Sequence, residues 1–414
     1  MTVTTSWLIR VGYYDDGTSI TLTDFTSRTL GMSVDVSAEV GQVGTRTATV
    51  TLDNNDGALT PGNGGTYSAW DWFERGLFIR AEVTDGTTTQ NVDVFGGIVS
   101  DFTLDDDGRN STVTITAVDA FQIIGRASPT TTYTAAAGVN TAQAFTSILA
   151  DNVDGIPKIG QTTPSWTLNV TTSGSSDTQH RWDAGEISGA AGDVLNGNVM
   201  PSSMLTAVPS GANTGRWTLN VGRLTWSNNV LDFDESGGTA IPFRTIQRGF
   251  DTAAVSNTAT LTTVDTGYVA TSTETVSVGK YGARARTYTV TADGATYADP
   301  GADEWANRFA ESTFDVRELV TSTSQVADQL ADASFADWAD ALFRPCWQPF
   351  TVTFTPTGGT PVTENVVSAG YLITATPQDT VVRFRFVPRA VFDDFILDDT
   401  RQGVLGTNRL GAFS

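Results

Sequence analysis

The chain has 414 residues, which is enough for about two to three domains. It carries 24 Lys and Arg against 46 Asp and Glu, a formal net charge of −22. A surface this acidic repels phosphate backbones and anionic membranes, which argues against specific nucleic-acid binding and against membrane docking. The single cysteine, Cys346, excludes an internal disulfide and a cysteine-based zinc site.

The composition predicts a β-rich protein. Thr and Val are abundant and Gly occurs 40 times, whereas Lys occurs only at positions 158 and 280. β-Branched residues fit pleated strands, and glycine supplies the turns between them. The start of the chain, Met1 to Ser6, resembles no signal peptide, and no apolar run is long enough for a membrane helix. We therefore expect synthesis in the cytoplasm of the producing cell and no membrane insertion.

Residues 1–128 predict a first β-barrel-like domain. Arg46 to Leu52, Leu77 to Val83 and Thr112 to Ala117 each alternate apolar and polar residues. Strict alternation of this kind is typical of half-buried antiparallel strands. Leu104 and Ser111 flank an acidic segment that contains Gly108, and this pattern predicts a hairpin turn.

Residues 129–245 predict a mixed α/β middle domain. Helical spacing occurs at 141–152, and a second short helix is expected at 191–200. The segment 171–189 is rich in Ser, Gly and Thr and predicts a surface loop. Residues 217–226 predict a hairpin around Gly222.

Residues 246–391 predict a second β-barrel-like domain, and 392–414 a C-terminal extension. Asp299 followed by Pro300 predicts a helix start, with Asp299 as the N-cap and the helix continuing to about Thr313. Another helix is expected at 333–343, followed by three strands. The overall class is thus β-rich α+β, and the two β blocks around a mixed middle are compatible with a duplicated domain that carries an insertion.

The extension is apolar but lacks a partner strand of its own. We expect it to dock on a neighbouring subunit or on its own barrel, because leaving it exposed would be costly. The residues expected at this subunit interface are Phe392, Phe395, Leu405 and Leu410.

Three stretches of the sequence resemble minor tail proteins of actinobacterial long-tailed phages and baseplate hub proteins of the late-control type. The first comprises Ala48–Pro61, Phe95–Phe102 and Val113–Phe121. The second is Val276–Arg286, which contains the pair Tyr281-Gly282. The third comprises Phe395–Asp399 and Gly403–Gly411. The turn residues within these stretches are Asp53, Asn54, Asp56, Gly57, Tyr281 and Gly282, and Gly108 is a further expected structural turn outside them.

The resemblance implies two hub domains that assemble as a homo-oligomer, typically a trimer, in a ring at the tail tip of the virion. It implies as neighbours a distal tail or tube protein, the tape measure protein, and tail fibres or receptor-binding proteins. If such a ring surrounds a DNA path, the net acidity of the chain predicts a carboxylate-rich inner face, along which DNA slides without sticking.

Two acidic segments are candidates for metal binding. Asp53-Asn54-Asn55-Asp56-Gly57 lacks the spacing of an EF-hand loop, because Gly falls at position 5 and position 12 is Gly64. A turn is favoured over calcium there, because Asn and Asp bond their own backbone in turns. The cluster 105–107 is favoured as an exposed hairpin tip. We predict no metal and no cofactor.

The sequence contains no recognisable catalytic set. His180 is the only histidine, Cys346 is far from it in sequence, and no nucleophile-elbow motif occurs. Paired carboxylates are unavoidable among 46 acidic residues, so none can be singled out for glycoside hydrolysis. We expect a structural virion protein and no enzyme. The alternatives are a host-attachment protein that reads glycans through Trp70-Asp71-Trp72-Phe73, for which core packing is the favoured reading, and a tail-associated hydrolase.

Overall fold

The computed structural model describes most of both β blocks and parts of the middle region. The described residues are 3–14, 20–38, 45–119 and 230–388, together with the strands named below between 120 and 229. Within these ranges the exceptions are 71, 73–74, 109, 251–254, 264–265, 291–293, 312–314, 332–333 and 344–345.

The first block is built of strands with one short 3-10 helix. Its elements are β1 (Thr4–Tyr14), β2 (Ile20–Asp24), η1 (Thr26–Arg28), β3 (Thr29–Ser37), β4 (Thr45–Asp53), β5 (Gly76–Thr84), β6 (Thr89–Asp106) and β7 (Ser111–Val118). In β4 the side chains of Ala48, Val50 and Leu52 are buried, and the threonines between them face the other side. The alternation predicted from the sequence is confirmed here.

The second block repeats this construction and adds two helices. Its elements are β15 (Leu231–Asp234), β16 (Thr245–Gly249), β20 (Asp315–Ser322), α6 (Thr323–Gln329), α7 (Phe335–Phe343), β21 (Pro349–Phe354), β22 (Val362–Ala375) and β23 (Thr380–Pro388). The predicted helix at 333–343 and the three strands after it are confirmed.

Both blocks belong to one sheet. Its 13 strands follow the path β16-β20-β23-β22-β3-β4-β7-β6-β5-β1-β2, with β21 and β15 attached beside β22. The blocks join where β3 pairs antiparallel with β22. One apolar core, which includes Val50, Ile115, Phe233 and Phe384, extends under both blocks. Among the described strands this path is open rather than closed into a barrel. β15 lies before the expected boundary at 245/246 and pairs parallel with β21 of the second block.

The two blocks share the same order of five strands. That order is β5-β6-β7-β4-β3 in the first block and β21-β22-β23-β20-β16 in the second. The register between β6 and β7 shifts at Val99/Asp101, and that between β22 and β23 shifts at Ser368/Gly370. β5 starts opposite Ile98 and β21 starts opposite Val367, in each case two residues before the bulge. Strand order, register and bulge position therefore agree with a duplicated domain.

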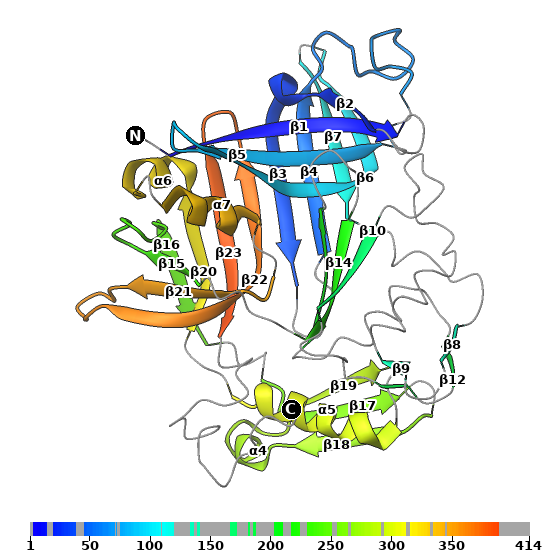
Figure 1. Ribbon diagram of the computed structural model, residues 1–414, viewed down its shortest axis with the longest axis vertical. Coiled ribbons are helices and arrows are strands. Elements are labelled where there is room, and N and C mark those ends of the chain that lie inside the picture. Colours follow the sequence, from blue (N-terminus) through cyan, green and yellow to red (C-terminus); the bar gives the residue numbers. More distant parts are fainter. Residues whose placement is uncertain are drawn as a thin grey trace.

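The copies differ in what connects and flanks these strands. β1 runs antiparallel to β5, whereas β15 runs parallel to β21. Residues 54–75 connect β4 to β5, and α6 and α7 make the equivalent connection from β20 to β21. The insertion between β16 and β20 is a small α/β unit, drawn at the lower end of the molecule in Figure 1.

The inserted unit contains β17 (Thr258–Thr263), β18 (Val269–Thr273), α4 (Thr275–Tyr281), β19 (Ala285–Val290) and α5 (Gly294–Arg308). α5 packs on β17 and β18, and Trp305 stacks on Tyr288 with ring centroids 4.0 Å apart. The predicted helix start at Asp299-Pro300 is wrong, because α5 begins at Gly294 and Pro300 lies inside it. Ala298, Ala302, Trp305 and Ala306 are all buried on one face, and this packing outweighs the backbone hydrogen bond that proline removes.

Three strands of the middle region form a separate sheet. β14 (Trp217–Arg223) lies between β10 (Trp166–Thr171), which is parallel to it, and β13 (Ser203–Pro209), which is antiparallel. The predicted hairpin around Gly222 is therefore wrong, because Gly222 lies within one strand whose two partners, β10 and β13, both precede it in the chain.

The predicted surface loop at 171–189 is also partly wrong. It contains β11 (Arg181–Trp182) and β12 (Gly185–Ile187), which pair with β9 (Val139–Asn140) and β8 (Tyr133–Ala135). The helices predicted at 141–152 and 191–200 lie outside the described residues.

Candidate functional site

Among the residues that the structure describes, those considered for chemistry are not gathered into a reactive site. Cys346 is fully buried, and burial raises the pKa of its thiol to about 11. His180 lies outside the described residues. Within the described part of the chain, no group of three or more His, Cys, Asp or Glu side chains is placed to hold a metal, and no helix is long and apolar enough to cross a membrane.

The burial of Cys346 predicts a thiol that does not react in the folded protein. A neutral, enclosed thiol is a poor nucleophile, because the thiolate is the reactive species. In a titration with a chromogenic disulfide reagent, we expect no thiol release from the native chain and one equivalent after unfolding in urea. Rapid labelling of the native protein would show that this part of the core opens to solvent.

The turn after β4 is organised by Asn54 and by an ion pair. Asn54 is buried, donates to Thr60 and Ser111, and accepts from the backbone of Leu59. Arg28 donates to both carboxylate oxygens of Asp56, at 2.9 and 2.5 Å, and lowers the pKa of that carboxyl to about 2. The guanidinium thus places a positive charge where a calcium ion would need the carboxylate.

The remaining residues of this turn have backbone roles. Asp53 accepts from the backbone N–H of Asn55, and Gly57 has a φ of 67°, which favours glycine. Asn55 accepts from the backbone of Ser111, the first residue of β7. The turn therefore ties the end of β4 to the β6–β7 hairpin.

The second block has an equivalent hydrogen bond between the end of one strand and the start of another, made by different residues. Thr323, which directly follows β20, accepts from the backbone N–H of Thr380 and donates to Asp379. Thr380 begins β23, just as Ser111 begins β7. This equivalence indicates that the motif Asp53 to Gly57 secures a hairpin, which is a structural role.

Replacing Asn54 with alanine is expected to destabilise the fold by about 1–3 kcal/mol, because it leaves the buried backbone and hydroxyl partners of the amide unsatisfied. Urea unfolding followed by far-UV circular dichroism measures this. Asn63→Ala is the matched control: Asn63 is exposed, and its side-chain amide donates to the carbonyl of Gly57. Equal losses for the two variants would contradict the assigned role of Asn54.

The acidic hairpin between β6 and β7 is a solvent-exposed turn. Asp106 accepts from the backbone N–H of Gly108, whose φ is 78°, and Asp107 accepts from Asn110. Asp105 lies in β6 directly opposite Thr112. The carboxylates are exposed, and two of them cap backbone N–H groups of their own turn.

Tyr281 and Gly282 end helix α4. Gly282 has a φ of 75° and donates to the carbonyl of Val278 as the C-cap. Asn257, which no sequence pattern indicated, lies fully buried beneath this turn and donates to the Gly282 carbonyl at 2.9 Å. It also accepts from Arg284 at 2.8 Å. The Tyr-Gly pair is thus held from a distant strand end, a contact that short-range spacing cannot indicate.

The tryptophans considered for glycan stacking lie in a packed aromatic cluster. Trp72 is only 4% exposed and its ring centroid is 5.0 Å from that of Phe102. Trp70 packs against Tyr67, and the Arg75 guanidinium carbon lies 3.6 Å from the centroid of the Trp70 ring. A sugar could stack on Trp70 at that position only by displacing Arg75, so this arrangement favours a packing role.

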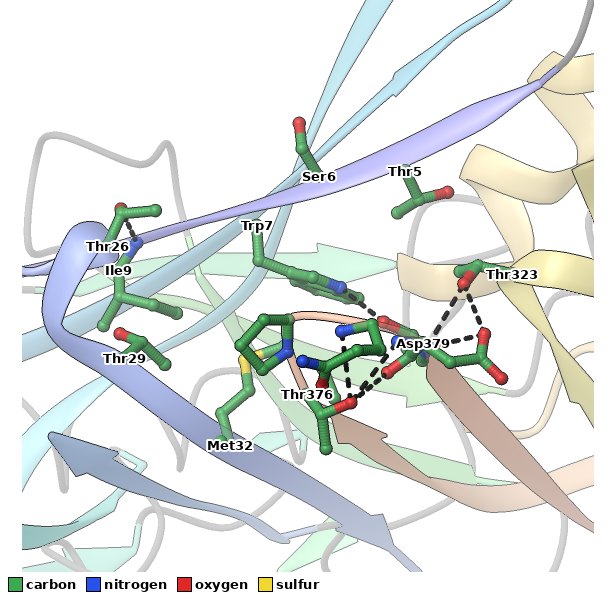
Figure 2. Close-up of a pocket in the computed structure, with 15 residues that line it drawn as sticks. Thr5, Ser6, Trp7, Ile9, Thr26, Thr29, Met32, Thr323, Thr376 and Asp379 are labelled. Atoms are coloured by element: carbon green, nitrogen blue, oxygen red, sulfur yellow. Dashed lines mark hydrogen bonds between the residues drawn. The ribbon is translucent and has the colours of Figure 1, made fainter. Parts of the chain in front are cut away.

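A crevice of about 300 Å³ lies where the blocks meet, between β1, β3 and the β22–β23 turn. Figure 2 shows Trp7 reaching across it; the Trp7 indole N–H donates to the hydroxyl of Thr380 at 2.8 Å. The Asp379 carboxylate accepts from Thr323 and Ser324. The hydrogen bond from Trp7 to Thr380 links the first block to the second across this crevice. We therefore describe the crevice as an interface between the two blocks and not as a ligand site.

The polar face of the sheet is a candidate for contact with other molecules. Asp53, Thr112 and Asp105 lie directly opposite one another across three strands, and so do Thr49, Thr116 and Asp101. Residues directly opposite in this way share a face. Charged residues of this face include Asp35, Asp53, Glu82, Asp93, Asp101, Asp105 and Glu318, with Arg10, Arg80, Arg383 and Arg385. Carboxylates are thus in excess among them, although Arg385 pairs with Asp35 at 3.0 Å and Arg383 with Glu318 at 3.2 Å.

The residues expected at a subunit interface, Phe392, Phe395, Leu405 and Leu410, lie outside the described residues. Two backbone edges take their place as candidates for assembly. β16 ends the path of the main sheet, and residues 100–106 of β6 pair only with β7 among the described strands.

Comparison with solved structures finds this fold in phage tail proteins. The 43 kDa tail protein of prophage MuSo2 from Shewanella oneidensis aligns with a TM-score of 0.54 at 12% identity, over 94% of this chain and 100% of that chain. The tail protein from Neisseria meningitidis MC58 also has a TM-score of 0.54, at 10% identity, over 92% and 96% of the two chains. A chain of the PdpA–VgrG complex has a TM-score of 0.50 at 8% identity, over 92% of this chain and 64% of that one.

No protein-family model matches the chain, and no curated protein matches it significantly in sequence. The similarity is therefore one of fold, and it covers nearly the whole chain. The chain is a β-rich protein with the fold of phage tail proteins.

Proposed function

We propose that the chain is a structural, non-enzymatic minor tail protein that forms a homotrimeric hub ring at the tip of a phage tail. The observation that carries this proposal is the fold similarity to two tail proteins over more than nine-tenths of each chain. The duplicated β block supports a ring, because a trimer of a two-copy chain presents six similar units around one axis.

In this proposal the two hub domains are formed by residues 1–128 and by residues 246–391 together with β15 at 231–234, and the sheet continues from one to the other through β3 and β22. The ring connects a distal tail or tube protein, and the tape measure protein, to fibres or receptor-binding proteins. The polar, carboxylate-rich face of the sheet would line the DNA path, because an acidic lining repels the phosphate backbone.

Antibody labelling of intact virions tests the position. We expect gold-labelled antibody against this chain to bind at the tail end distal to the capsid in negative-stain images. An antibody against a major capsid protein is the control for labelling away from the tail. Labelling of the capsid, or none in virions that contain the chain by mass spectrometry of gel bands, would contradict the proposal.

A further inference from the structure

The duplicated blocks meet inside the chain at one pair of strands, and the strands equivalent to that pair each have an unpaired edge in the described part of the chain. Inside the chain, β3 of the first block pairs antiparallel with the C-terminal half of β22 in the second block. The strand equivalent to β3 is β16, and the strand equivalent to β22 is β6. We propose that β16 of one chain pairs antiparallel with residues 103–106 of β6 in a second copy of the same chain. This inference rests on the proposed ring and names the contact that closes it.

The register follows from shared partners. Ser33 pairs with Thr49, which pairs with Thr116 and so leads to Asp101, the first residue after the bulge in β6. In the second copy, Gln247 pairs with Glu318, which pairs with Arg385 and so leads to Gly370, the first residue after the bulge in β22. Gln247 therefore occupies the place of Ser33.

The same register comparison identifies the residue of the second chain that lies opposite Gln247. Ser33 pairs with Thr374 at the internal junction. Thr374 lies four residues after Gly370, and the residue four after Asp101 is Asp105. The pair expected between chains is therefore Gln247 with Asp105, and its neighbours are Ile246 with Asp106 and Arg248 with Leu104.

The exposure of Leu104 shows that the edge of β6 lacks a neighbouring strand that the equivalent part of β22 has. Leu104 is equivalent to Ile373, because each lies three residues after the first residue beyond the bulge. Ile373 is 0% exposed beneath the internal junction, whereas Leu104 is 37% exposed. A leucine in a core-facing position that stays open to solvent is what an uncovered interface leaves behind. β13 approaches β6 without forming a paired register with it.

The charges of the two edges are complementary. The β6–β7 hairpin carries Asp105, Asp106 and Asp107. On the other edge, Arg244 directly precedes β16 and Arg248 lies within it. Arg244 is exposed, and Arg248 pairs with Glu364 at one side of its strand. Opposite charges across two edges favour their encounter and fix the register. Because the two edges differ, the contact is head-to-tail, and it closes into a ring when the rotation from one chain to the next is a whole fraction of a turn.

Paired cysteines test the register directly. The test uses one double variant, with Gln247→Cys and Asp105→Cys in the same chain. It is oxidised at protein concentrations where the oligomer forms, and the buried Cys346 is left unchanged. Directly opposed residues of antiparallel strands lie within disulfide reach. We expect covalent trimers on a non-reducing gel, converted to monomers by reductant.

Two control variants frame this result. Ser33→Cys with Thr374→Cys is the equivalent pair inside the chain and should give a cross-linked monomer. Gln247→Cys with Thr103→Cys moves one cysteine about 7 Å along the strand, beyond disulfide reach, and should give no covalent oligomer. Trimers by light scattering that do not cross-link at 247 and 105 would overturn the edge pairing and leave the proposed ring standing. A chain that is monomeric at every concentration, without cross-links between chains, would overturn both.

A surface substitution gives an independent readout. Leu104→Lys should weaken the trimer at least about tenfold, since it puts a charge where an apolar side chain becomes buried. Leu30→Lys is the matched control, because Leu30 is also exposed in the chain but lies outside the proposed contact. Both variants should unfold at the same temperature as the parent monomer. Equal weakening of the trimer by the two variants would contradict the placement of Leu104.

Discussion

Replacing Gly370 with alanine is expected to lower the free energy of unfolding by about 3 kcal/mol or more, because strain and overpacking act together. Gly370 has a φ of 144°, which L side chains rarely adopt. A β-carbon there would lie 2.0 Å from the carbonyl oxygen of Val36, on the strand that joins the two blocks. Neither backbone can move away without breaking the β3–β22 pairing.

Urea unfolding of the purified chain measures this loss. Gly31→Ala is the matched control at the same junction, because its β-carbon would meet the Ala375 carbonyl at an ordinary 3.6 Å. We expect that control to change stability by less than about 1 kcal/mol. A Gly370→Ala chain as stable as the parent would mean that β3 and β22 do not approach as closely as described.

Replacing Trp338 with alanine is expected to cost about 3–5 kcal/mol, the usual range for a fully buried aromatic side chain. Trp338 lies on α7, which belongs to the second block but packs on β5 and β6 of the first. It is 0% exposed, and its indole N–H donates to the hydroxyl of Thr5 at 3.0 Å. Its loss therefore opens a cavity in a core that both blocks share.

The sharing of this core predicts how the variant unfolds. Tryptophan fluorescence and far-UV circular dichroism should show both blocks unfolding together, at a lower urea concentration than in the parent. Trp338→Phe keeps most of the apolar volume and should lose less than half as much stability. Two separate transitions, with only the later block destabilised, would show that each block has an independent core.

Prediction from the sequence succeeded where the signal is local. Ala48, Val50 and Leu52 alternate with threonines because every second side chain of a strand faces the core, and the structure buries these three. The hairpin at Gly108 was predictable for a similar reason, since a turn with positive φ selects glycine.

Prediction failed where packing against other elements overrides a local preference. Gly222 looks like a turn residue, but β10 and β13 lie on both sides of its strand. Pro300 looks like a helix start, but Ala298 before it and Trp305 after it are buried in the same apolar cluster, and the helix begins at Gly294. In both cases tertiary packing supplies more free energy than the local preference.

The sequence by itself determined the β-rich class, the alternating faces of the strands and the turns, because these depend on side-chain periodicity and on backbone preferences of single residues. Only the tertiary structure decided that the two blocks share one sheet and one core, and which edges stay open. Strand partners such as β3 and β22, more than 330 residues apart along the chain, are chosen by register and shape across the whole fold. No short stretch of sequence contains that information.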